Sequence, residues 1–169
     1  MKRELEKKDF KVFVPVMPDS NEPKIETWIP FISKLVDKPD ENTYLIGHSI
    51  GCQTILRYLQ TIDKKIGGAI FVAGWFRLAK YESDEEKRIA KPWIEDNIDF
   101  EKVKSNCKKF VAIFSTNDPF VLINDNAPIF REKLDIKNIK IEKNKGHFSG
   151  SDGITELSVV LDGLLEMIE

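Results

Sequence analysis

Short apolar runs alternate along the chain with segments of helical periodicity, and this alternation constrains the fold more than any other feature of the sequence. The apolar runs are rich in β-branched and aromatic side chains and cover residues 12–16, 44–46, 69–72, 110–115 and 139–142. Helical patterns separate or follow them at about residues 25–36, 52–60, 127–133 and 154–168. Repeated strand–helix units predict an α/β fold, a three-layer sandwich whose mostly parallel central sheet is covered by helices on both faces.

The length of 169 residues suits one domain with a single core, so we expect residues 1–169 to form one unit. Residues 74–105 differ from the rest, because they combine tryptophans with the charge-rich segment 82–88. This segment is predicted to be either a surface helix pair or a small cap over the sheet.

Composition excludes several classes of function. Hydrophobic residues make up 41% and charged residues 32%, with a formal net charge of -2, which favours neither nucleic acid nor an anionic membrane as a partner. No apolar stretch reaches the length of a membrane span.

The two cysteines, Cys52 and Cys107, are too few for a disulfide framework or a zinc site, and we expect both to be buried in a cytoplasmic protein. Two histidines make no convincing metal-ligand set, so neither a metal nor another cofactor is expected.

The strongest chemical signal is the pentapeptide Gly47-His48-Ser49-Ile50-Gly51, which lies between an apolar strand and a helical pattern. A sharp strand-to-helix turn would expose the serine hydroxyl, and glycines two residues on either side would avoid a collision. The N-terminus of the following helix would direct its dipole, and the N–H of Ile50, at a developing oxyanion. The sequence therefore predicts a nucleophile elbow, although a tight turn with an incidental serine is the simpler alternative.

A serine nucleophile needs a base, and the chain offers His48 and His147. We expect His48 to point away from the hydroxyl, whereas His147 follows the last predicted strand at the sheet edge where Ser49 lies. Asp118 follows the preceding strand and is predicted to orient His147. Both residues also have a purely structural interpretation: His147 could be a histidine that only packs against its neighbours, and Asp118 could only form an Asp-Pro turn. The chain order serine, aspartate, histidine is that of α/β-hydrolases.

The chain resembles the family of small α/β-hydrolase-fold serine hydrolases that includes retinoblastoma-binding protein 9 and YdeN. The matching stretches run in order along the chain, at residues 14–19, 28–31, 42–52, 115–120 and 146–148. The resemblance implies a triad of Ser49, Asp118 and His147, and hydrolysis of small esters or amides without a metal.

The beginning of the chain departs from this family, whose members open with a strand and a His-Gly loop. The present sequence is expected to start inside the helix that follows them, so that the sheet lacks the family's first strand between residues 12–16 and 44–46. Losing one oxyanion donor costs roughly a hundred- to a thousandfold in rate, so the activity of this chain is open. We hypothesise a truncated or misassigned start; closure of the flanking strands and occupation of the slot by another chain are the alternatives.

These observations predict a serine hydrolase that acts on small carboxylic esters or amides. Trp75 and Phe76 follow the strand at residues 69–72 and are candidates either for the substrate pocket or for core packing. The main alternative is a catalytically impaired member of the fold that serves as a binding or scaffold protein. A module that binds a phosphorylated ligand at the helix N-terminus is a weaker alternative, since the chain has neither a P-loop nor a dinucleotide fingerprint.

Overall fold

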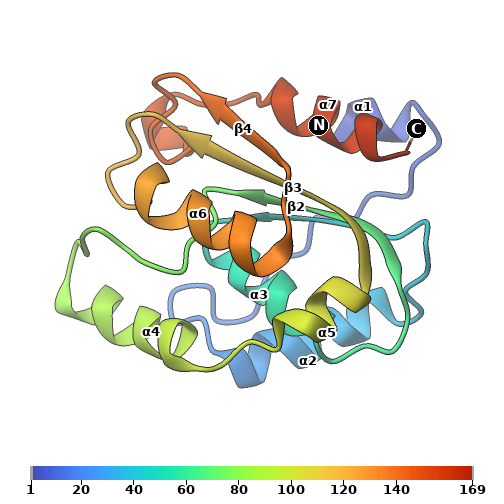
Figure 1. The fold of residues 1–169 in the computed structure, drawn as a ribbon, viewed down its shortest axis with the longest axis horizontal. Helices are drawn as coiled ribbons and strands as arrows, with labels where there is room; N and C mark the ends of the chain where they lie inside the picture. The colour runs from blue at the N-terminus through green and yellow to red at the C-terminus, as the bar shows by residue number, and fades with distance from the viewer. Residues whose placement is uncertain (1, 169) are drawn as a thin grey trace.

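A computed structural model describes residues 2–168 and has a parallel sheet at its centre. Its four strands lie in the order β1 (Tyr44–His48), β2 (Ile66–Val72), β3 (Cys107–Ser115) and β4 (Asn138–Glu142) (Figure 1). The register aligns Ile46 with Ile70, and Ile70 with Val111. Four of the predicted strands are therefore confirmed, with ends that extend beyond the apolar runs.

Helices cover both faces of this sheet, as the alternation of strands and helices predicts (Figure 1). One face carries α1 (Lys2–Glu6) and α7 (Ser158–Ile168). The other carries α2 (Ile25–Val36), α3 (Ile50–Leu59), α4 (Asp84–Glu95), α5 (Phe100–Ser105) and α6 (Ile123–Leu134). A short 3₁₀ turn, η1 (Gly150–Asp152), precedes α7. None of the helices between residues 2 and 168 is both long and apolar enough to cross a membrane.

The core is divided into two clusters because side chains alternate across the sheet. Ala69 and Phe71 of β2 pack into the cluster under α3 and α6, whereas Ile70 and Val72 pack into the cluster under α7. All four are nearly inaccessible to solvent. A strand that is buried on both faces reads as a continuous apolar run, which is why the sequence reveals β2 so clearly.

The strand predicted at residues 12–16 is wrong. This segment has no regular structure, and Phe13, Val14 and Val16 are 57%, 71% and 90% exposed. Among the described residues β1 pairs with β2 alone, so no neighbouring strand supplies backbone hydrogen bonds to residues 12–16. An apolar run is necessary for a buried strand but does not by itself provide a pairing partner.

Residues 74–105 contain α4 and α5, joined to β2 by an irregular segment. Trp93 of α4 is 1% exposed and packs edge-on against Trp28 of α2, with ring centroids 5.9 Å apart. The charge-rich residues at the start of α4 face solvent. The helix α4 therefore packs against α2 through Trp93 and exposes its charged side to solvent.

Candidate active site

Ser49 lies at the turn between β1 and α3, as the strand–turn–helix pattern predicts. Its backbone adopts φ 52° and ψ −119°, a conformation that L-residues rarely adopt and that strains the turn. The Ser49 N–H donates to the carbonyl of Val72 at 2.9 Å, which ties the turn to the end of β2. Ile50 is the first residue of α3, so its backbone N–H has no acceptor within the helix.

The two glycines of the elbow are not equivalent. A Cβ on Gly47 would lie 2.7 Å from the backbone of Gly51, closer than real Cβ contacts allow. A Cβ on Gly51 would meet no atom within 4 Å outside its own helix turn. The expectation that both glycines avoid a collision therefore holds for Gly47 and is wrong for Gly51.

Cys52 is the other nucleophilic side chain near the elbow, and its surroundings make it unreactive. It is fully buried, and its thiol donates to the carbonyl of Gly47 at 3.2 Å. Burial raises the pKa of the Cys52 thiol well above its ordinary value. Because the thiolate is the reactive form of cysteine, the buried thiol of Cys52 is a poor candidate nucleophile, and Ser49 is the remaining candidate in the turn.

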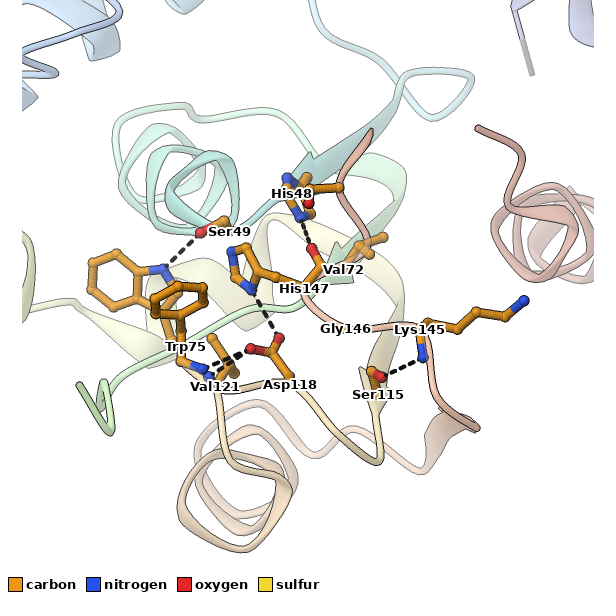
Figure 2. Close-up of polar contacts among 12 residues, drawn as sticks. His48, Ser49, Val72, Trp75, Ser115, Asp118, Val121, Lys145, Gly146 and His147 are labelled. Carbon is orange, nitrogen blue, oxygen red and sulfur yellow. Dashed lines mark hydrogen bonds and ion pairs between the residues drawn. The ribbon is translucent and has the colours of Figure 1, made fainter. Parts of the chain in front are cut away.

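Asp118 and His147 form a close pair (Figure 2). The distance from His147 Nδ1 to Asp118 Oδ2 is 2.8 Å, and Asp118 is 4% exposed. The other carboxylate oxygen, Oδ1, accepts the N–H groups of Phe120 and Val121 at 2.9 and 3.0 Å. These contacts fix the carboxylate and orient the imidazole, as the sequence predicts for this pair.

The imidazole of His147 lies between Asp118 and Ser49 (Figure 2). Among residues 2–168 no hydrogen bond joins His147 to Ser49 Oγ; that oxygen accepts a bond from Trp75 Nε1 at 3.3 Å. A catalytic hydrogen bond is often long in a structure without substrate and shortens when substrate binds. The structure thus brings the three predicted residues together in the order required for proton transfer.

Two polar residues that the sequence analysis missed hold the loop that carries His147. The side-chain oxygen of Asn117 accepts the N–H of Gly146 at 2.8 Å, and Ser115 Oγ accepts the N–H of Lys145 at 3.0 Å. Ser115 is the last residue of β3, and Asn117 lies in the turn that follows, directly before Asp118. Ser and Asn are turn-forming residues, so their positions beside Asp118 are the only signal that could have revealed this role.

Asp152 supports the same loop from its other side. Its Oδ2 accepts the backbone N–H groups of His147 and Ser149 at 2.9 and 3.0 Å. Hydrogen bonds from the Ser149 hydroxyl and N–H lower the pKa of this carboxyl below its usual range. Gly146 has φ 54°, and a Cβ there would overlap the Asp152 side chain. Asp152 is therefore a structural residue of the loop rather than the acid of the pair.

His48 does not serve the nucleophile directly. Its Nε2–H donates to the backbone carbonyl of His147 at 2.7 Å, and the two rings lie 5.0 Å apart. Desolvation of the ring against this loop lowers the pKa of His48. His48 thus connects the turn at Ser49 to the loop that carries His147.

Trp75 and Phe76 have different surroundings. The indole of Trp75 is 2% exposed and contacts the Ser49 hydroxyl (Figure 2). The ring of Phe76 packs against Phe130 and Phe100 at 4.7 and 5.7 Å and lines a cavity of about 160 Å³. A third aromatic residue, Phe120, lies edge-on to His147 at 5.3 Å, which the sequence does not predict.

Among the described residues, no three His, Cys, Asp or Glu side chains gather in a group suited to a metal ion.

Comparisons with known proteins identify relatives over most of the chain. A family model described as serine hydrolase matches residues 3–166. YdeN from Bacillus subtilis is 30% identical over 153 residues, which cover 88% of this chain and 75% of that protein. The serine hydrolase RBBP9 of Rattus norvegicus is 29% identical over 147 residues, covering 85% of this chain and 72% of the relative.

Solved structures extend the likeness to the fold. The crystal structure of the ydeN gene product from B. subtilis matches with a TM-score of 0.88 and 26% identity, covering 99% of this chain and 87% of that chain. A carboxylesterase structure from Nitrososphaera gargenis has a TM-score of 0.67 at 12% identity and covers 99% of this chain and 84% of its own, which shows a shared fold alone. The resemblance stated from the sequence is thereby confirmed, and the chain belongs to the serine hydrolase family.

Proposed function

We propose that this chain hydrolyses small carboxylic esters or amides through an acyl-enzyme formed on Ser49. The observation that carries the proposal is the His147 ring, held 2.8 Å from the buried Asp118 and facing the elbow that presents Ser49 (Figure 2). Membership of the serine hydrolase family and a fold shared with carboxylesterases support it. Fold alone does not select among esters, amides and thioesters, so the substrate class rests on the site.

In the proposed acylation step, Ser49 Oγ forms a bond to the carbonyl carbon of the substrate while its proton moves to His147 Nε2. Asp118 stabilises the imidazolium and keeps Nδ1 protonated. Negative charge collects on the former carbonyl oxygen, where the N–H of Ile50 and the N-terminal dipole of α3 would stabilise it. The tetrahedral intermediate collapses when His147 returns the proton to the leaving alcohol or amine.

Deacylation repeats these steps with water. His147 removes a proton from a water molecule, whose oxygen attacks the acyl carbon, and the proton then returns to Ser49 Oγ. The second product is a carboxylic acid. We propose that Trp75 and Phe76, which follow β2, border the space available to the acyl or alcohol group.

Hydrolysis of p-nitrophenyl acetate and butyrate tests the proposal, with thioester and anilide analogues of the same acyl groups to define the substrate class. Ser49→Ala is expected to lower kcat at least about a thousandfold, and Asp118→Asn by roughly 10³–10⁴-fold through the wrong histidine tautomer. Ser105→Ala, which changes an exposed serine of α5, should leave the rate unchanged. Equal rates for Ser49→Ala and the unmodified chain would contradict the proposal and favour a binding role for the fold.

A further inference from the structure

The hydroxyl of Ser49 has a hydrogen-bond partner that the proposed triad does not use. Among residues 2–168 that partner is Trp75, whose Nε1 lies 3.3 Å from Ser49 Oγ. An indole N–H donates and cannot accept, so Ser49 Oγ must accept in this contact. The serine proton is therefore not involved in the bond to Trp75.

The hydrogen-bonding capacity of the Ser49 hydroxyl allows it to bind Trp75 and His147 at the same time. A serine hydroxyl has one proton and two lone pairs. Trp75 occupies one lone pair, which leaves the proton for His147 and the second lone pair for attack on a carbonyl carbon. Figure 2 shows Trp75 and His147 approaching Ser49 from different sides, as this division requires.

The position of Trp75 is fixed by its backbone as well as by burial of its ring. Ala73 adopts φ 46°, which turns the chain at the end of β2. The side-chain amide of Gln53, itself 1% exposed, donates to the carbonyl of Trp75. The indole is thus held against Ser49 by α3, the helix that also carries the elbow.

Asn126 of α6 fixes the segment that follows Trp75. Its side-chain oxygen accepts the N–H groups of Phe76 and Arg77 at 2.7 and 3.0 Å, and its NH₂ group donates to the carbonyl of Arg77 at 3.0 Å. Asn126 is fully buried. A donor that is held in place before the reaction needs no reorganisation when charge develops nearby, which is the condition for electrostatic catalysis.

We propose that Trp75 is a catalytic hydrogen-bond donor to Ser49 Oγ, an inference that rests on the function proposed above. Its N–H orients the hydroxyl and stabilises the negative charge that grows on Oγ as the proton moves to His147. The resting distance of 3.3 Å exceeds the usual value of about 2.9–3.0 Å. The bond is expected to shorten as Oγ becomes anionic, since charge-assisted bonds are shorter and stronger.

Replacement of Trp75 by 3-benzothienylalanine tests this role, because sulfur replaces the N–H and the bicyclic shape is kept. Trp75→Phe is the simpler variant. We measure the rate of Ser49 labelling by a fluorescent fluorophosphonate and expect both variants to react about tenfold more slowly, the effect of one lost hydrogen bond. Trp28→Phe is the matched control, because its buried indole donates to the carbonyl of Pro18 at 2.8 Å.

The ¹⁵N–¹H resonance of the Trp75 indole provides a second, independent readout. In Ser49→Ala it should shift upfield, while the indole resonances of Trp28 and Trp93 stay in place. A benzothienylalanine variant that labels as fast as the unmodified chain would overturn the role of Trp75 and leave the proposed function standing. Failure of the unmodified, folded chain to label would instead overturn the proposed function, and the role of Trp75 with it.

Discussion

At the scale of single residues, the conformation of Ser49 depends on the absence of a side chain at Gly47. The turn brings the start of α3 back against the end of β1, and Gly47 lies where the two backbones are closest. A side chain at that position would push them apart. Gly51 lies on the first turn of α3, where an added Cβ would point into open space.

Alanine at these two glycines should therefore have opposite effects. Gly47→Ala is expected to destabilise the protein by about 1–3 kcal/mol, the usual cost of overpacking, and to slow labelling of Ser49. Gly51→Ala should leave stability unchanged or raise it by up to about 1 kcal/mol, because alanine favours a helix more than glycine does. Urea unfolding of both variants measures this, and equal losses would show that the 2.7 Å approach at Gly47 does not govern the turn.

The sequence located the three residues of the proposed triad more readily than the residues that hold them in place. Ser49, Asp118 and His147 each follow an apolar run, and the carboxyl ends of parallel strands meet at one edge of a sheet. Asp152 and Trp75 could not be assigned in this way, because their contacts arise from turns at Gly146 and Ala73 that have positive φ. Such turns have no periodic signal in the sequence.

At the scale of elements, the loop between β4 and η1 carries His147 and is bound on three sides. Ser115 at the end of β3 and Asn117 in the following turn hold it on one side, Asp152 of η1 on a second, and His48 of β1 on a third. Each of these contacts ends on a backbone group. The loop is therefore positioned by its main chain, and the imidazole takes its orientation from Asp118.

Asp152→Asn should make the stability of the protein less dependent on acid pH. The folded pKa of Asp152 is lowered, so its carboxylate stabilises the fold above the unfolded value of about 3.9, and this contribution is lost as the pH falls through the folded pKa. The variant should be less stable than the unmodified chain at pH 7, with a difference that shrinks toward pH 3. Asp63→Asn, at a carboxyl 93% exposed, is the control. Thermal unfolding across this range that leaves the Asp152 difference constant would contradict the linkage.

For the whole molecule, the central strands of the sheet were predicted correctly from the sequence, whereas the strand predicted at residues 12–16, beside β1, is absent. The central strands β2 and β3 are covered by helices on both faces, and their apolar runs identified them (Figure 1). Residues 12–16 are also rich in apolar side chains, but they include Pro15 and have no pairing partner among residues 2–168. An apolar run alone could not distinguish the two cases, because pairing depends on which strands lie beside one another.

Matched valine-to-alanine changes test this difference. Val16→Ala removes methyl groups that are 90% exposed and should change the free energy of unfolding by less than about 0.5 kcal/mol. Val111→Ala in β3, at a side chain 1% exposed, should cost about 2 kcal/mol through lost burial and a cavity. A comparable loss at Val16, measured by urea unfolding, would mean that residues 12–16 are packed as a strand in solution.

Intact-protein mass spectrometry after incubation with a fluorophosphonate tests whether Ser49 is the nucleophile. We expect that one phosphonyl group is added, that peptide mapping locates it on Ser49, and that His147→Ala reacts far more slowly because the base is lost. Adduct formation at the same rate in Ser49→Ala, or no adduct on the folded unmodified chain, would contradict the assignment of Ser49 as the nucleophile.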